Sequence, residues 1–265
     1  DFRGRDVRGK AVIIHAIPRP GIISLISSPA VRGAIRRADE HSAAAILLVI
    51  ELPGNIQTSL YNVNSSVPTL ALGSNDGATL QQMLSDADPN QPPRLRLRLD
   101  VEEVSGLTTT VVFGEVPAAT DDAEKIVIVA HRDAFFEGAS DNASGVATAI
   151  ELATYFSQVP RSQRRRTVEI IGTPGHHNRA RTGMVWLEEN RESVLRRAVL
   201  LMNAEHSAHA LVDHWGAALQ ATNSLGPFSW RVNGSAELLE IANRAFDGFG
   251  IPRWAQTGGP RGEFS

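Results

Sequence analysis

Histidine and aspartate residues with the spacing of metal ligands follow one apolar segment of the sequence. Residues 126–130 are apolar and mostly β-branched, which is typical of a short strand that is buried on both faces. His131 and Asp133 come directly after this segment, and an extended backbone points two side chains at this spacing in the same direction. One of the two could bind a metal ion while the other orients it, as is usual around a metal-bound histidine. The pattern therefore indicates a metal site at the carboxyl end of a buried strand.

Asp141 is a third candidate ligand, in the loop after this strand. It precedes Asn-Ala-Ser-Gly and a segment whose apolar residues recur at helical spacing. Aspartate is also a favoured N-cap residue, so Asp141 could serve only to begin that helix. His131 and Asp133 beside the same loop favour the metal-binding interpretation.

Two later apolar segments also end in residues that can bind metals. The strand predicted over residues 166–171 leads to Gly-Thr-Pro-Gly-His176-His177, and the strand predicted over residues 198–202 leads to Glu205. Ligands of open α/β sheets gather at the carboxyl ends of the strands, so we expect all these side chains to converge. The alternative is that the two histidines only form a turn and that the glutamate faces solvent.

The loop around Asp141 resembles the metal-binding signature of the di-zinc aminopeptidase family, which also includes glutamate carboxypeptidases, transferrin receptors and glutaminyl cyclases. The resemblance is carried by His131-Arg-Asp133, followed by Gly-Ala-Ser-Asp141-Asn-Ala-Ser-Gly. It implies that His131 binds one zinc ion, that Asp133 supports this histidine, and that Asp141 bridges two zinc ions. It also implies an α/β fold with a mixed, mostly parallel sheet flanked by helices.

The sequence departs from this family in the loop after the second strand. The family has two adjacent glutamates there, the first a general base and the second a zinc ligand. His177 takes the ligand position, and histidine is a routine zinc ligand. His176 takes the base position, where a neutral imidazole can accept a proton, although a nearby zinc ion would lower its pKa. The resemblance implies two zinc ions held by His131, Asp141, His177 and Glu205, with His176 and Asp133 as catalytic residues.

The family has a final histidine ligand near its C-terminus, and nothing before Ser265 matches it. His206, His209 and His214 follow Glu205 at mixed spacing, and we expect them to line a cleft or to face solvent. The sequence also begins without a methionine. We therefore expect the chain to be a piece of a longer protein, truncated at both ends.

Residues 1–105 resemble the protease-associated domain that is often inserted into such peptidases. The likeness is carried by Asp-Val-Arg-Gly-Lys-Ala-Val-Ile near the N-terminus and by the strand-helix-strand pattern that follows. We expect this smaller, β-rich domain to cover a substrate cleft or hold a partner, with the catalytic-type domain over residues 106–265. The predicted elements of the first domain are strands over residues 11–17, 44–50, 67–72 and 95–101, and helices over residues 30–42 and 75–87.

Composition excludes several functional classes. The formal net charge is -3 and neither half is basic, so we expect no nucleic-acid partner. The cluster Arg161, Arg164, Arg165 and Arg166 is expected to form a solvated turn. The longest apolar run, residues 43–50, is far too short to span a membrane. Without cysteines, any metal ion must be bound by histidine, aspartate or glutamate.

The sequence as a whole favours a zinc-dependent metallopeptidase, aminopeptidase-like, that hydrolyses peptide bonds with metal-activated water. One alternative is a catalytically inactive binding or receptor module, which the missing base and final ligand would suit. A second alternative is a single-zinc acyltransferase of the glutaminyl-cyclase type. By resemblance alone, we expect a peptide substrate and a secreted or periplasmic location.

Overall fold

The chain divides into two compact units, which are described here one at a time. The first unit comprises residues 1–105 and 213–220, and the second comprises residues 106–212 and 221–265. The structure is a computed structural model, and it describes residues 2, 4–17, 28–57, 60, 63, 65–102, 104–177, 181–208, 210–215, 218–226 and 230–252.

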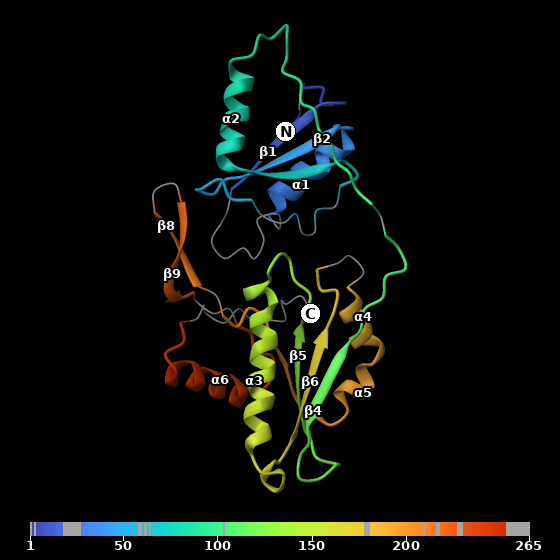
Figure 1. Ribbon diagram of the computed structural model, residues 1–265, viewed down its shortest axis with the longest axis vertical. Helices are drawn as coiled ribbons and strands as arrows, with labels where there is room; N and C mark the ends of the chain where they lie inside the picture. The colour runs from blue at the N-terminus through green and yellow to red at the C-terminus, as the bar shows by residue number, and fades with distance from the viewer. Residues whose placement is uncertain are drawn as a thin grey trace. The chain divides into compact units, whose positions relative to one another are not determined.

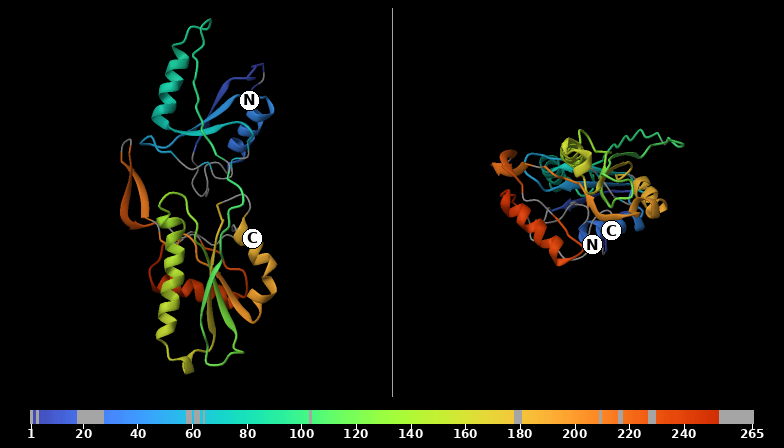
Figure 2. Two further views of the ribbon diagram at one scale, coloured as in Figure 1. Left: turned by 45° about the vertical axis from the view of Figure 1, so that its right-hand side comes forward. Right: turned by 90° about the horizontal axis from the view of Figure 1, so that it is seen from below.

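The first unit contains a three-stranded parallel sheet in the order β1-β2-β3. The central strand β2 is buried at all six positions, because helices cover it on both sides. Figure 2 shows the strands between the two helices of this unit. The elements are β1 (Ala11–Ala16), α1 (Pro29–Glu40), β2 (Ala45–Ile50), β3 (Thr69–Gly73) and α2 (Ser74–Ser85).

The two helices of this unit pack on opposite faces of the sheet because strand side chains alternate between faces. Val31 and Ile35 of α1 lie in one core with Ile46 and Leu48 of β2. Burial of each such side chain contributes about 1.5–3 kcal/mol. On the other face, α2 approaches Val49 so closely that a Cβ at Gly77 would collide with it.

The strand predicted over residues 95–101 is wrong. The structure has no regular element there, and Leu95, Leu99 and Val101 are 50%, 52% and 74% exposed. The alternation of leucine with polar residues matched a half-buried strand, but among the described residues no neighbouring strand pairs with this segment. Alternation alone cannot stabilise a strand, because a strand needs a partner for its backbone hydrogen bonds.

The second unit contains the four-stranded sheet that carries the candidate site, in the order β4-β6-β5-β7. Strands β5, β6 and β7 are parallel, and β4 is antiparallel to β6. The predicted mixed, mostly parallel α/β sheet is therefore confirmed. The strands are β4 (Val112–Val116), β5 (Lys125–His131), β6 (Thr167–Thr173) and β7 (Ala198–Asn203).

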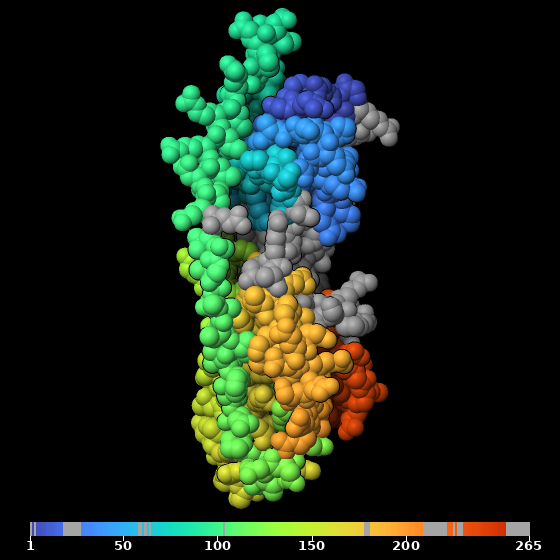
Figure 3. All heavy atoms as spheres, turned by 90° about the vertical axis from the view of Figure 1, so that its right-hand side faces the viewer, coloured from blue at the N-terminus to red at the C-terminus, as the bar shows by residue number. Residues whose placement is uncertain are grey.

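Helices cover both faces of this sheet (Figure 1). Ala149 of α3 (Gly145–Gln158) packs against Ile128 of β5 and Val168 of β6. On the opposite face, α4 (Thr182–Glu189) and α5 (Arg191–Leu195) form a core with Val127, Val129 and Ile171. Figure 3 looks onto this second side, where the side chains of α4 and α5 form the outer surface. The two central strands, β5 and β6, are therefore the buried part of the sheet, while β4 and β7 at its edges are largely exposed.

The remaining elements of the second unit lie outside the sheet. Three residues of the arginine cluster make ion pairs or hydrogen bonds within this unit. Arg161 forms an ion pair with Asp121, Arg166 forms one with Glu124, and Arg164 donates a hydrogen bond to the backbone oxygen of Val159. In the part of the chain that the structure describes, no helix is both long and apolar enough to cross a bilayer. The additional elements of this unit are η2 (Ala139–Ser144), η3 (Arg161–Gln163) and α6 (Ala236–Gly248). The hairpin strands β8 (Ala210–Trp215) and β9 (Ala218–Leu225) belong partly to each unit, because residues 213–220 are assigned to the first.

Candidate metal centre

The candidate site lies at the carboxyl ends of β5, β6 and β7. His131 is the last residue of β5, pairs in register with Thr173 of β6, and is fully buried. Its Nδ1 is 3.1 Å from the backbone oxygen of Asp133, which holds the ring in one orientation. When Nδ1 carries the proton and donates it there, Nε2 keeps its lone pair for a metal ion.

Asp141 lies in η2, between β5 and α3, and its two oxygens face different imidazoles. Oδ1 is 3.1 Å from Nε2 of His131 and 3.3 Å from Nε2 of His206. Oδ2 is 3.1 Å from Nε2 of His177. Burial acts to raise the pKa of Asp141, but the neighbouring imidazoles of His131, His206 and His177 outweigh it and lower the pKa well below the usual range. The carboxyl group is therefore ionised, as a metal ligand must be.

The residues present fit a metal ion. The Nε2 atom of His131 and the Oδ1 atom of Asp141 are buried, and neither makes a hydrogen bond of good geometry, although they lie 3.1 Å apart. Buried polar atoms are normally satisfied, so two that converge in this way need another partner. A divalent cation would satisfy both a lone pair of a neutral imidazole and a carboxylate oxygen.

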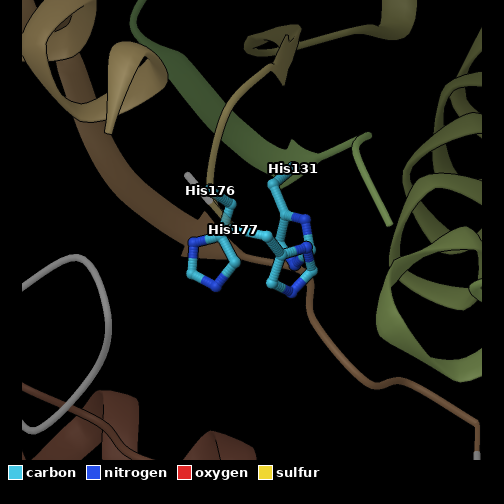
Figure 4. Close-up of side chains that lie close together, drawn as sticks. All are labelled: His131, His176 and His177. Carbon is cyan, nitrogen blue, oxygen red and sulfur yellow. The ribbon is translucent and has the colours of Figure 1, made fainter. Parts of the chain in front are cut away.

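Three histidines gather at this point, as Figure 4 shows for His131, His176 and His177. One nitrogen of each ring lies within 4.8 Å of the others, so these rings are close enough to share a metal ion. The ring of His176 stacks on that of His131 with centroids 4.1 Å apart, and the ring of His177 is perpendicular to that of His131. The structure thus brings both histidines of the loop after β6 to the end of β5.

Asp133 holds this histidine loop in place. Its Oδ1 accepts a hydrogen bond from the backbone N–H of His176 at 3.0 Å, and its Oδ2 accepts one from His177 at 2.9 Å. Burial acts to raise the pKa of Asp133, but these two backbone N–H groups outweigh it and lower the pKa. The carboxylate is 3.7 Å from Nδ1 of His131, farther than the Asp133 backbone oxygen. Its nearest contacts therefore position the loop rather than the ring of His131.

Replacing Asp133 with asparagine should loosen the histidine loop. The asparagine side chain has one acceptor oxygen, and its NH₂ group replaces the second carboxylate oxygen. One of the two backbone N–H groups, at His176 or His177, therefore loses its acceptor. We expect a local cost of about 1–3 kcal/mol. It should appear as roughly 10- to 100-fold faster hydrogen exchange at the His176 and His177 amides. The exposed Asp122→Asn serves as control, and equal exchange in both variants would contradict the role of Asp133.

Glu205 and His206 follow β7 and complete the cluster. The Oε1 atom of Glu205 lies 3.8 Å from Nε2 of His131 and 3.9 Å from Nε2 of His176. The Glu205 side chain is only 16% exposed, so it points into the site rather than to solvent. His206 was expected to line a cleft or face solvent; its side chain is 41% exposed, and its Nε2 also lies 3.3 Å from Asp141 Oδ1. Of the other two histidines, His209 lies outside the described residues and the side chain of His214 is not described.

One protein family matches the part of the chain that carries most of this site. Residues 111–176 match the model of peptidase family M28. The match confirms the resemblance to M28 peptidases. The M28-like segment contains His131, Asp133 and Asp141 and ends at His176, whereas Glu205 lies beyond it. No curated protein matches the chain at a significant level.

Solved structures show where the fold recurs. BSAP, a zinc aminopeptidase from Bacillus subtilis, matches with a TM-score of 0.62 and 17% identity over 96% of this chain and 56% of BSAP. The peptidase M28 precursor from Shewanella amazonensis SB2B matches with a TM-score of 0.58 and 19% identity over 94% of this chain and 55% of that protein. At this identity the matches show a shared fold, and the chain spans just over half the length of each protein.

Asn142 joins the parts of the M28-like site and was missed by the sequence analysis. It is 1% exposed, and its Nδ2 donates to the backbone oxygens of His131 at 3.1 Å and Ala204 at 3.0 Å. Its Oδ1 accepts from the backbone N–H groups of Gly145 at 3.2 Å and His206 at 3.1 Å. One side chain therefore connects the ends of β5 and β7 to the start of α3. Its position directly after Asp141 was the only signal in the sequence.

A hollow of about 350 Å³ lies beside the histidine loop. Asp133 and His177 of the candidate site form part of its wall. Its lining residues are Thr109, Arg132, Asp133, Pro174, Gly175 and His177.

Proposed function

We propose that this chain is part of a zinc-dependent metallopeptidase, aminopeptidase-like, that hydrolyses peptide bonds. The observation that carries the proposal is that the two carboxylate oxygens of Asp141 face two different imidazoles. Its Oδ1 faces His131 and its Oδ2 faces His177, each at 3.1 Å. A carboxylate that offers one oxygen to each of two separate imidazoles is arranged to bridge two metal ions.

The donors fall into two groups on either side of Asp141. His131 and Glu205 belong with Oδ1, and His177 belongs with Oδ2. Histidine nitrogens and carboxylate oxygens are normal zinc ligands, and thiolates are absent. Zinc bound there would act as a Lewis acid on the peptide carbonyl and would lower the pKa of water to near 7.

The protein's own residues supply binding, positioning and proton transfer in this proposal. Asp133 holds the backbone of the histidine loop, and so sets the position of both imidazoles. His176 is the group that we assign as proton acceptor, since its ring lies against His131 with Nε2 3.9 Å from Glu205. The hollow beside His177 admits the substrate. We further propose that the first unit is a protease-associated domain and that the protein is secreted or periplasmic, both by resemblance.

The test measures hydrolysis of a panel of aminoacyl amides by the full-length protein that contains this chain. We expect turnover that a chelator abolishes and added Zn²⁺ restores. His176→Ala should lower turnover by about 10²- to 10⁴-fold, the usual contribution of a general acid or base, while zinc content stays unchanged. The surface variant His41→Ala is the control.

Two outcomes would contradict this assignment. A zinc-loaded, correctly folded protein that hydrolyses no member of the panel would leave the binding module as the better interpretation. Full activity in His176→Ala would show that another group accepts the proton.

A further inference from the structure

We propose that His206 is a metal ligand and that it completes a four-donor zinc site with His131, Asp141 Oδ1 and Glu205. This inference rests on metal binding at the proposed site and does not depend on catalysis. The four side chains come from the end of β5, from η2 and from the residues after β7. They all belong to the second unit.

Four of the six distances between these donors are close to those around a single tetrahedral ion. Asp141 Oδ1 lies 3.1 Å from Nε2 of His131 and 3.3 Å from Nε2 of His206. Glu205 Oε1 lies 3.8 Å from Nε2 of His131 and 3.9 Å from Nε2 of His206. Zinc–ligand distances of about 2.0–2.2 Å place neighbouring donors of a tetrahedral site about 3.3–3.6 Å apart. The four nitrogen–oxygen edges therefore differ from an occupied site by only a few tenths of an ångström.

The backbone of His206 is held in the conformation that this position requires. Its φ angle is 49°, in the left-handed region, which non-glycine residues adopt infrequently. Its backbone N–H donates to Asn142 Oδ1, the atom that also accepts from Gly145. Residues held in such conformations cluster at functional sites, because the surrounding structure must compensate their cost. The same Asn142 also binds the backbone of His131, so the two imidazoles share one support.

This ligand set assigns different roles to the two sides of Asp141. Two nitrogens and two oxygens from the protein fill all four positions around an ion on the Oδ1 side, and closed sites of this kind are structural. The Oδ2 side has His177 and borders the hollow, so it is the side left open for substrate. The mixed nitrogen and oxygen donors favour Zn²⁺ and similar transition metals over Ca²⁺ and Mg²⁺, which prefer oxygen alone.

The test measures Zn²⁺ affinity of the 265-residue chain by competition with a chromogenic chelator, at one equivalent of metal. X-ray absorption at the zinc edge then counts the imidazole ligands. His206→Ala should lower the affinity for this first zinc ion by more than about 100-fold. Losing a residue that only supports a ligand usually costs roughly 10- to 100-fold. The imidazole count should fall by one.

Two substitutions at the same position separate ligand loss from backbone damage. Both aspartate and asparagine tolerate the left-handed conformation, but only aspartate is a good zinc ligand. His206→Asp should therefore retain most of the affinity, and His206→Asn should lose it as alanine does. His41→Ala, which removes an exposed histidine from the first unit, should bind zinc normally.

The competing ligand set is His131, His176 and His177, whose nitrogens lie within 4.8 Å of one another. If His176→Ala lowers the affinity for the first zinc ion and His206→Ala does not, the three-histidine set binds this ion and the proposal is wrong. Unchanged affinity and imidazole count in His206→Ala would also overturn it. Zinc binding that depends on His206 in a protein without peptidase activity would support this inference and refute the proposed function.

Discussion

Replacing Asp141 with alanine is expected to remove the bound zinc. The substitution deletes both oxygens that face His131, His206 and His177, and leaves Glu205 as the nearest carboxylate to His131 and His206. The site would lose the only ligand that belongs to both of its sides. We expect zinc affinity to fall by at least about 100-fold, beyond the range seen for supporting partners of ligands. Zinc content per chain after gel filtration, measured by elemental analysis, checks this directly.

Two further variants make the Asp141 result specific. Asp141→Asn keeps the shape of the side chain and one oxygen, and should retain part of the affinity on the side that this oxygen faces. Asp122→Ala removes an exposed carboxylate of the same unit and should bind zinc as the parent does. Unaltered zinc stoichiometry in Asp141→Ala would refute the bridging role, whatever the peptidase activity.

Replacing Asn142 with alanine should cause the largest loss of stability in the second unit. Four backbone groups, at His131, Gly145, Ala204 and His206, lose their partner inside a site where Asn142 is 1% exposed. Each buried polar group left unsatisfied costs about 1–3 kcal/mol. Relaxation and entry of water will offset part of this, so we expect a net loss of about 3–5 kcal/mol.

Hydrogen exchange is the suitable measurement, because a chain of two compact units need not unfold in one step. We expect amides of β5 and β7 to exchange much faster in Asn142→Ala, while those of β2 in the first unit stay protected. Asn142→Asp should also be destabilised, because a carboxylate cannot donate to the oxygens of His131 and Ala204. Asn90→Ala, at an exposed turn, is the control, and equal protection in Asn90→Ala and Asn142→Ala would contradict the role of Asn142.

Local pattern predicted most elements of the second unit within a few residues. The strand predicted over residues 126–130 is β5, and those over residues 166–171 and 198–202 are β6 and β7. The signal was strongest for the central strand β5, whose last five residues are buried because both faces of the sheet are covered there. The hairpin β8–β9 and helix α6 were not predicted. The segment 95–101 shows the opposite error, a strand pattern without a partner strand.

The sequence by itself determined which side chains stand at the strand ends, because strand order and chain direction bring residues that follow parallel strands to one edge. It also determined the chemistry of the donors, since no cysteine is available. Only the tertiary structure decided which atoms face one another. Three features depend on contacts between segments that are distant in the sequence: the position of Asp141 between His131 and His177, the hydrogen bonds of Asp133 to the histidine loop, and the position of His206. Three-dimensional packing sets such contacts, so residue spacing along the chain does not predict them.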